Sequence, residues 1–252
     1  MLFHMPLVII AFYFVLGTVL GSFGSVLVTR TVGKRSFGGR SVCPSCKKQL
    51  RAWELVPIVS FILLRGRCAR CRKPIGAFYP LLELLSGLLF VLALVKIPYP
   101  VPSVLFGLGL WLLLIIAVID FRLHAIPDVF TAALVAAGIL LNLSMGVNPV
   151  PAMLLGGGFF GLLWIASRGR WIGSGDVLLG AGVGALLGDW RFTAAALFLT
   201  YVVGAAIASV LLASGKLHRG SSVAFGPFLA LGTLLTILWA DRIGAVMAVY
   251  FS

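Results

Sequence analysis

Apolar residues dominate this chain in long runs that are separated by short polar or basic stretches. Runs of about 20 residues, the length that a helix needs to cross the hydrocarbon core of a bilayer, recur along it. We expect about eight membrane-spanning helices, at roughly 5–28, 78–97, 101–120, 126–145, 151–167, 174–188, 193–213 and 223–240. The sixth run is the shortest. The pattern predicts an all-α fold, a polytopic bundle of membrane helices.

The composition supports this interpretation. Of the 252 residues, 61% are hydrophobic and only 11% are charged, whereas about a quarter of the residues in soluble domains are charged. The net charge of +13 would also suit a protein that binds nucleic acid. In membrane proteins, however, Lys and Arg collect on cytoplasmic loops. We therefore expect membrane lipid, and not nucleic acid, as a partner.

The basic residues divide the chain into regions. The segment 29–77 holds 12 of the 20 Lys and Arg residues, and the positive-inside rule predicts that it is cytoplasmic. We expect a first transmembrane helix at 1–28, a cytoplasmic loop at 29–77 and a transmembrane helical bundle at 78–252. The start of the chain lacks the positive n-region and the cleavage site of a signal peptide, so we expect the first helix to be retained.

All four cysteines fall in this basic loop, as two C-x-x-C pairs, Cys43 with Cys46 and Cys68 with Cys71. This spacing suits tetrahedral coordination of a structural zinc ion by thiolates. The loop is otherwise polar and too small for a deep core, so a metal would supply much of its folding free energy. Two disulfides, which a reducing compartment disfavours, and a redox role are the alternatives. Four protein ligands would leave no open position for catalysis at the metal.

Two of the seven acidic residues lie at the ends of apolar runs. Asp120 closes one run, and Asp176 completes the motif Gly-Ser-Gly-Asp at 173–176. If the spans alternate from the cytoplasmic loop, both lie at the cytoplasmic face. Two carboxyl groups that meet there would share a proton and activate a water molecule. The structural alternatives are that Asp120 pairs with Arg122 and that Asp176 caps the short sixth helix.

Other residues receive structural interpretations. Asp128 falls in the first turn of the fourth span, where a carboxylate complements the helix dipole. Glu83 lies about one turn inside the second span, and we expect it to form an ion pair with a basic residue of the loop. Gly180, Gly184 and Gly188 have the spacing that allows close helix packing; docking of a substrate helix is the alternative.

Taken together, these motifs resemble the bacterial type IV prepilin peptidases, the leader peptidases of type IV pilus and type II secretion systems. The resemblance covers nearly the whole chain. It rests on the segments 21–30, 43–76, 79–83, 120–128, 173–176 and 225–232.

The resemblance implies an integral aspartic endopeptidase of the bacterial inner membrane, with its peptidase core at about 101–215. The catalytic pair would map onto Asp120 and Asp176, and the substrates would be type IV prepilins and pseudopilins. The resemblance also implies N-methylation of the product with S-adenosylmethionine, for which no motif is readable here. Ser25 and Leu178 stand where the family usually has asparagine and lysine. A transporter or scaffold that uses the aspartates for ion coupling is the alternative.

Overall fold

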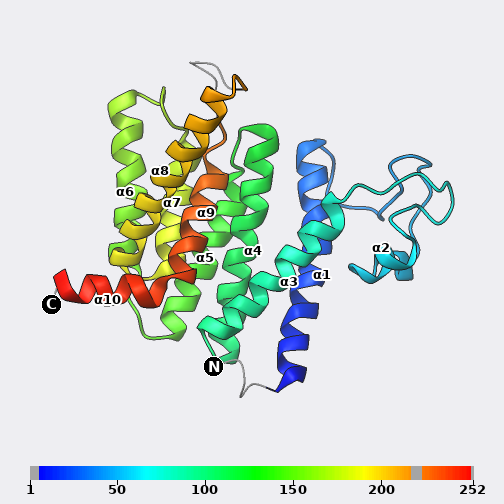
Figure 1. Ribbon diagram of the computed structural model, residues 1–252, viewed down its shortest axis with the longest axis horizontal. Helices are drawn as coiled ribbons and strands as arrows, with labels where there is room; N and C mark the ends of the chain where they lie inside the picture. The colour runs from blue at the N-terminus through cyan, green and yellow to red at the C-terminus, as the bar shows by residue number, and fades with distance from the viewer. Residues whose placement is uncertain (1–5, 217–222, 251–252) are drawn as a thin grey trace. The chain divides into compact units, whose positions relative to one another are not determined.

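The computed structural model describes residues 6–216 and 223–250, which form helices and connecting loops (Figure 1). The helices are α1 (Leu7–Val32), the short 3-10 helix η2 (Ala52–Leu55), α2 (Val59–Leu63), α3 (Phe78–Lys96), α4 (Pro100–Leu123), α5 (Asp128–Ser144), α6 (Val150–Ser167), α7 (Ser174–Leu187), α8 (Trp190–Ala213), α9 (Gly226–Leu238) and α10 (Ala240–Tyr250). Across the described ranges the β-pairing amounts to two isolated bridges in the cysteine loop. The all-α prediction is confirmed.

An apolar helix lies at each of the eight predicted runs, although Met5, where the first run was expected to begin, lies outside the described residues. Five of these helices, α1, α3, α4, α6 and α8, are long and apolar enough to cross a membrane. The helices α5, α7 and α9 have 17, 14 and 13 residues, short of the usual 20. The chain is a multi-pass membrane protein, and a total of eight complete spans stays a prediction.

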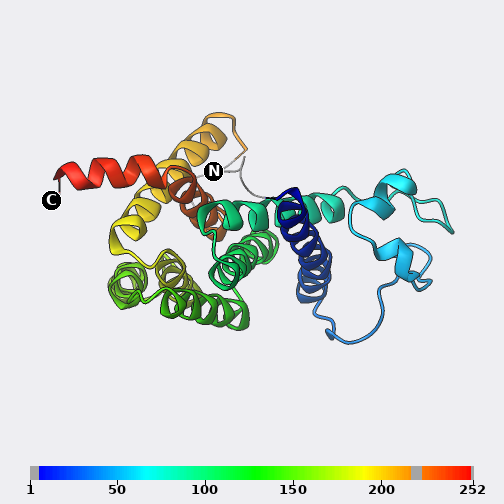
Figure 2. The same cartoon turned by 90° about the horizontal axis from the view of Figure 1, so that it is seen from below.

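The chain divides into two compact units, Met1–Trp111 and Leu112–Ser252, so α4 contributes to both. In the first unit α1 packs along α3 (Figure 2). Small residues bring the two backbones together: a Cβ atom at Gly21 would lie 2.7 Å from the Cα of Glu83. Close backbone approach of this kind is the usual way for helices to associate in lipid.

In the second unit α7 packs between α5 and α6. A methyl group on Gly180 would lie 2.6 Å from the carbonyl oxygen of Gly156, and one on Gly184 would overlap the backbone of Ala152. The predicted packing role of these glycines is confirmed for Gly180 and Gly184. Gly188 ends α7 in the left-handed conformation with φ of 71°, and a Cβ atom there would overlap the side-chain amide of Asn142 on α5, so this glycine also allows close packing.

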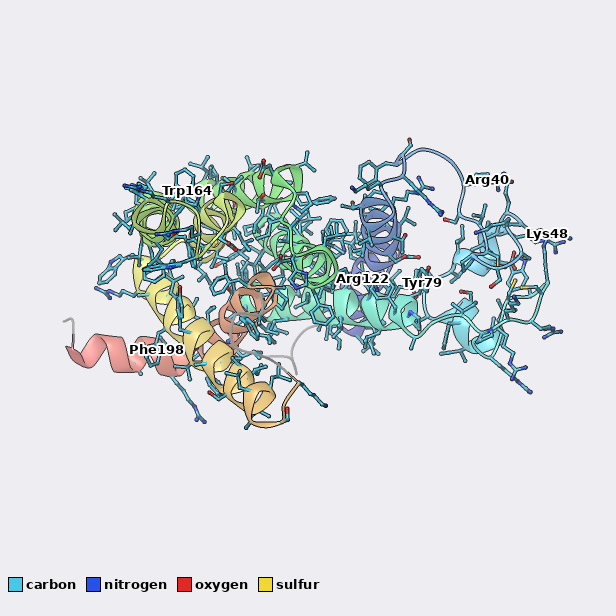
Figure 3. The ribbon with its side chains drawn as sticks, turned by 90° about the horizontal axis from the view of Figure 1, so that it is seen from above. Arg40, Lys48, Tyr79, Arg122, Trp164 and Phe198 are labelled. Atoms are coloured by element: carbon cyan, nitrogen blue, oxygen red, sulfur yellow. The ribbon has the colours of Figure 1, made fainter. Side chains whose placement is uncertain are left out.

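The cysteine loop between α1 and α3 departs from the prediction in one respect. It was expected to be polar apart from its cysteines, but the segment 52–64 is largely apolar and contains η2 and α2. Basic side chains, including those of Arg40 and Lys48, are exposed on the loop (Figure 3). The loop therefore combines a charged surface with an apolar insertion.

Candidate metal centre and carboxyl pair

The two C-x-x-C pairs sit on backbone turns of the same geometry. In the first turn the N–H of Cys43 donates to the carbonyl of Lys48, and in the second the N–H of Cys68 donates to that of Lys73, both at 3.0 Å. Each turn is closed by an isolated β-bridge between the residues that flank it. Each of these two similar turns therefore carries two cysteine sulfur atoms.

The four sulfur atoms converge on one point. They all lie within 4.8 Å of one another, and the Sγ atoms of Cys43 and Cys71 are 3.9 Å apart. The N–H of Lys73 favours the Cys71 thiolate, but partial burial and hydrogen bonds with the other three thiols outweigh it and raise the pKa of Cys71 to about 11. Four thiols this close together do not readily ionise, because their thiolates would repel one another. A bound cation stabilises the thiolate forms. These four cysteines can hold a metal ion.

Asp120 lies in the last turn of α4 and is buried, with 5% of its surface exposed. Its Oδ2 atom accepts a hydrogen bond of 2.7 Å from the backbone N–H of Gly226, the first residue of α9. The first N–H groups of a helix have no partner within the helix and readily bind a carboxylate. The start of α9 therefore holds the Asp120 side chain in place.

Asp176 is the third residue of α7 and is 9% exposed. Its Oδ2 atom accepts a hydrogen bond of 3.0 Å from the N–H of Gly173, the residue before the helix. The carboxylate thus caps its own helix, as one of the structural interpretations expected. The same bond fixes the direction of the carboxyl group, so capping and a chemical role are compatible.

The ends of three helices bring the two aspartates together. A Cβ atom at Gly175, in the first turn of α7, would lie 3.1 Å from the Cβ of Ile126, just beyond the end of α4. The carboxyl groups of Asp120 and Asp176 interact electrostatically. Two residues that lie 56 positions apart in the sequence therefore belong to one buried site.

Aromatic residues border this site. The ring of Tyr201, on α8, lies 5.8 Å from that of Phe225, whose neighbour in the chain donates to Asp120. Phe225 also contacts Phe160 of α6, with ring centroids 5.3 Å apart. Tyr201 also lies near Asp176. The carboxyl pair is therefore flanked by apolar rings.

Other acidic residues lie elsewhere. Asp128 is exposed in the first turn of α5, the position expected for a residue that complements the helix dipole. Glu83 is buried on α3, where it accepts a hydrogen bond from the backbone N–H of Ile58. For the part of the chain that the structure describes, this backbone partner replaces the expected ion pair.

Gly226 is the residue of the site that sequence reasoning missed. It lies within 225–232, one of the segments on which the resemblance rests, but no role was assigned to it. Its signal was indirect: a glycine directly before Pro227 marks a helix start, and such a start can bind an anion. Nothing in the sequence indicated that the anion is the side chain of Asp120.

Fold and site define a class of protein: a multi-pass membrane protein with a loop whose four cysteines can hold a metal ion, and with a pair of buried carboxyl groups held at helix ends. Two family models match the chain. The Bacterial Peptidase A24 N-terminal domain matches residues 15–97, and the Type IV leader peptidase family matches residues 107–209. The chain belongs to the type IV leader peptidase family.

Curated relatives agree with this assignment. The chain is 37% identical to the prepilin leader peptidase/N-methyltransferase of Burkholderia pseudomallei, over 91% of this chain and 85% of the relative. It is 30% identical to the protein of the same name from Legionella pneumophila, over 81% and 74%, and 31% identical to that from Pseudomonas aeruginosa, over 81% and 72%. No solved structure shows significant similarity to the chain.

Proposed function

We propose that this protein is an aspartic endopeptidase that removes the short basic leader from type IV prepilins and pseudopilins, with Asp120 and Asp176 as its catalytic pair. The observation that carries the proposal is that two buried carboxyl groups lie near enough to influence each other, each held through Oδ2 by a backbone N–H at a helix N-terminus. The names of the relatives support the substrate class. Family membership favours the enzyme over a transporter or scaffold.

The held oxygens suggest how the pair works. Because Oδ2 of each aspartate is bound to backbone, we assign the Oδ1 atoms to the shared proton and to the attacking water. The ionised aspartate takes a proton from water as the water oxygen adds to the peptide carbonyl. The protonated aspartate polarises that carbonyl. Transfer of a proton to the leaving nitrogen then breaks the C–N bond. Because the two aspartates share one proton, their pKa values describe the pair and not either residue alone.

The proposal includes an orientation. The positive-inside rule places the loop 29–77, and hence the carboxyl pair, toward the cytoplasm of a bacterial inner membrane. A prepilin would present its basic leader on that side and its apolar helix within the bilayer. The scissile bond would then lie at the membrane face, where the ends of α4, α7 and α9 meet.

We assign zinc to the cysteine cluster. Zinc–sulfur bonds of about 2.3 Å in a tetrahedron place sulfur atoms about 3.8 Å apart, close to the 3.9 Å between Cys43 and Cys71. When bound, zinc would hold the two turns of the loop together. Cys43, Cys46, Cys68 and Cys71 would be its ligands, and all four positions would be filled, so its role would be structural.

We extend the proposal to methylation of the new N-terminal amine, with S-adenosylmethionine as methyl donor. The support is that the relatives' names include N-methyltransferase. The methyl group would pass from the sulfonium to the amine nitrogen, with release of one proton. We assign no residue to this step.

The test of the catalytic pair is to make Asp120→Asn and Asp176→Asn separately and to incubate each purified variant with a prepilin. General acid–base catalysis contributes about 10²–10⁴-fold to a rate, so each variant should lose at least about a hundredfold. Mass spectrometry of the pilin would show leader loss and any added methyl group in one measurement.

Asp128→Asn is the matched control. It makes the same chemical change at an exposed carboxylate shortly after Asp120 in the chain, and we expect the wild-type rate. The thermal midpoint should be equal in all three variants, which shows that each is folded. If either Asp120→Asn or Asp176→Asn cleaves the prepilin as fast as Asp128→Asn does, Asp120 and Asp176 are not the catalytic pair.

A further inference from the structure

The apolar insertion of the cysteine loop exposes large side chains that a loop in water would bury. Ile62 and Leu63 of α2 are 65% and 70% exposed. Six large apolar side chains of the segment 52–64 are exposed: Trp53, Leu55, Val56, Val59, Ile62 and Leu63. So many exposed apolar side chains within one short segment of a loop indicate an interaction site.

A hydrogen bond ties this segment to a membrane helix. The backbone N–H of Ile58 donates to Oε2 of Glu83 at 2.8 Å. Glu83 is the sixth residue of α3, so its Cα lies about 7.5 Å along the helix from the first residue. Because α3 has only 19 residues, nearly its whole length is needed to cross the hydrocarbon core. Ile58 is therefore held at the membrane boundary rather than out in solution.

The backbone conformation of Ile58 is unusual. Ile58 has φ of 60° and ψ of −50°, and the N–H of Val59 bonds to the carbonyl of Pro57. This is the rare γ-turn with positive φ, which is costly for a β-branched residue. Such a conformation persists only where the surroundings determine it. The Glu83 carboxylate is the partner that the turned N–H group meets.

The charges around the segment indicate what covers its apolar surface. Arg51 precedes the segment, and Arg65 and Arg67 follow it. The one acidic residue of the loop, Glu54, accepts a hydrogen bond from the N–H of Arg51. Apolar side chains with a tryptophan, flanked by arginines and held at the end of a membrane helix, match the boundary between acyl chains and anionic headgroups.

We propose that residues 52–64 form an interfacial membrane anchor, whose exposed apolar side chains enter an anionic lipid leaflet while Glu83 holds the segment at that depth. The anchor would keep the metal-binding loop against the membrane surface. This inference concerns the first unit of the chain alone and does not depend on the peptidase chemistry proposed above.

The depth of Trp53 tests the proposal. The protein is placed in nanodiscs of phosphatidylcholine and phosphatidylglycerol, with and without bromine on the upper acyl chain. The Trp53 signal is the difference in fluorescence between wild type and Trp53→Phe. We expect brominated lipid to remove most of this signal and aqueous iodide to remove little of it.

Lys48→Trp, made in the Trp53→Phe background, is the matched control, because Lys48 is exposed on the same loop (Figure 3). Its signal should show the reverse pattern, with strong quenching by iodide. Iodide quenching of Trp53 equal to that of Lys48→Trp would overturn the proposal. Protection of Trp53 from both quenchers would also overturn it, because the surface would then be covered by protein.

Two substitutions test the hydrogen bond between Ile58 and Glu83. Glu83→Gln keeps an oxygen that accepts the Ile58 N–H, whereas Glu83→Ala removes it. We expect Trp53 in Glu83→Ala to become more accessible to iodide, and Trp53 in Glu83→Gln to stay close to wild type. Equal iodide accessibility in the two variants would show that Glu83 does not hold the segment at its depth.

Discussion

Substitution of Gly226 by alanine tests whether a backbone N–H positions the carboxylate of Asp120, one of the two proposed catalytic residues. An added Cβ would lie 2.9 Å from Oδ2 of Asp120 and 3.2 Å from the Cβ of that residue. Ordinary contacts between such atoms begin at about 3.5 Å. The methyl group would therefore displace a side chain and leave the helix backbone where it is. Because the displaced group is the carboxylate itself, we expect activity to fall while the fold persists.

The magnitude follows from the bond that is lost. The carboxylate must retreat by about 0.5 Å, which lengthens its 2.7 Å bond to Gly226 toward the limit of about 3.2 Å for such bonds. Hydrogen bonds to charged groups contribute about 1.5–3 kcal/mol. If all of this is lost in the transition state, kcat falls by about 10- to 160-fold, with KM little changed.

The assay is cleavage of a purified prepilin by enzyme in detergent, with kcat and KM measured separately. Gly158→Ala is the matched control, since Gly158 is also a helical glycine of the second unit and a Cβ there meets nothing within 4 Å. Both variants should keep the thermal midpoint of wild type or exceed it slightly. Equal kcat for Gly226→Ala and Gly158→Ala would refute the positioning role of the α9 start.

Two further predictions concern stability and metal binding. Gly156→Ala should lower the thermal midpoint clearly, because its methyl group would overlap the Gly180 carbonyl on α7 and neither backbone can yield; Gly158→Ala is again the control, and equal midpoints would contradict the packing argument. Cys46→Ser should reduce bound zinc, measured by elemental analysis, to well below one ion per chain, since a hydroxyl is a poor replacement for a thiolate ligand. Full zinc content in that variant would remove Cys46 from the ligand set.

Much of the metal centre could be predicted from the sequence, because its ligands are close along the chain. Cys43 and Cys46 share one turn, as do Cys68 and Cys71, so local spacing restricts where their sulfur atoms can lie. The apolar insertion between the two turns was missed. Its residues are apolar in the sequence, but their exposure and the hydrogen bond from Ile58 to Glu83, 25 residues away, are visible only in the structure.

The carboxyl pair could be predicted from the sequence only in part. Topology and motif indicated that Asp120 and Asp176 belong to one membrane face, since hydropathy alone determines where spans begin and end. Hydropathy says nothing about which helices are neighbours within the bundle, and it did not indicate that the start of α9 binds Asp120. The capping of α7 by Asp176 was predictable, because its partner Gly173 lies only three residues away.

The sequence by itself thus indicated the class of protein, the helical segments, the four cysteines that can hold a metal ion and the two aspartates of the proposed pair, because each rests on local periodicity, short spacing or a recognisable motif. Tertiary structure decided which groups hold those aspartates, which glycines cannot carry a side chain, and where the apolar segment of the loop is tied. These features depend on contacts between residues far apart in the chain. Such contacts depend on how closely one helix surface fits against another. The pattern of residues along the chain does not specify that fit.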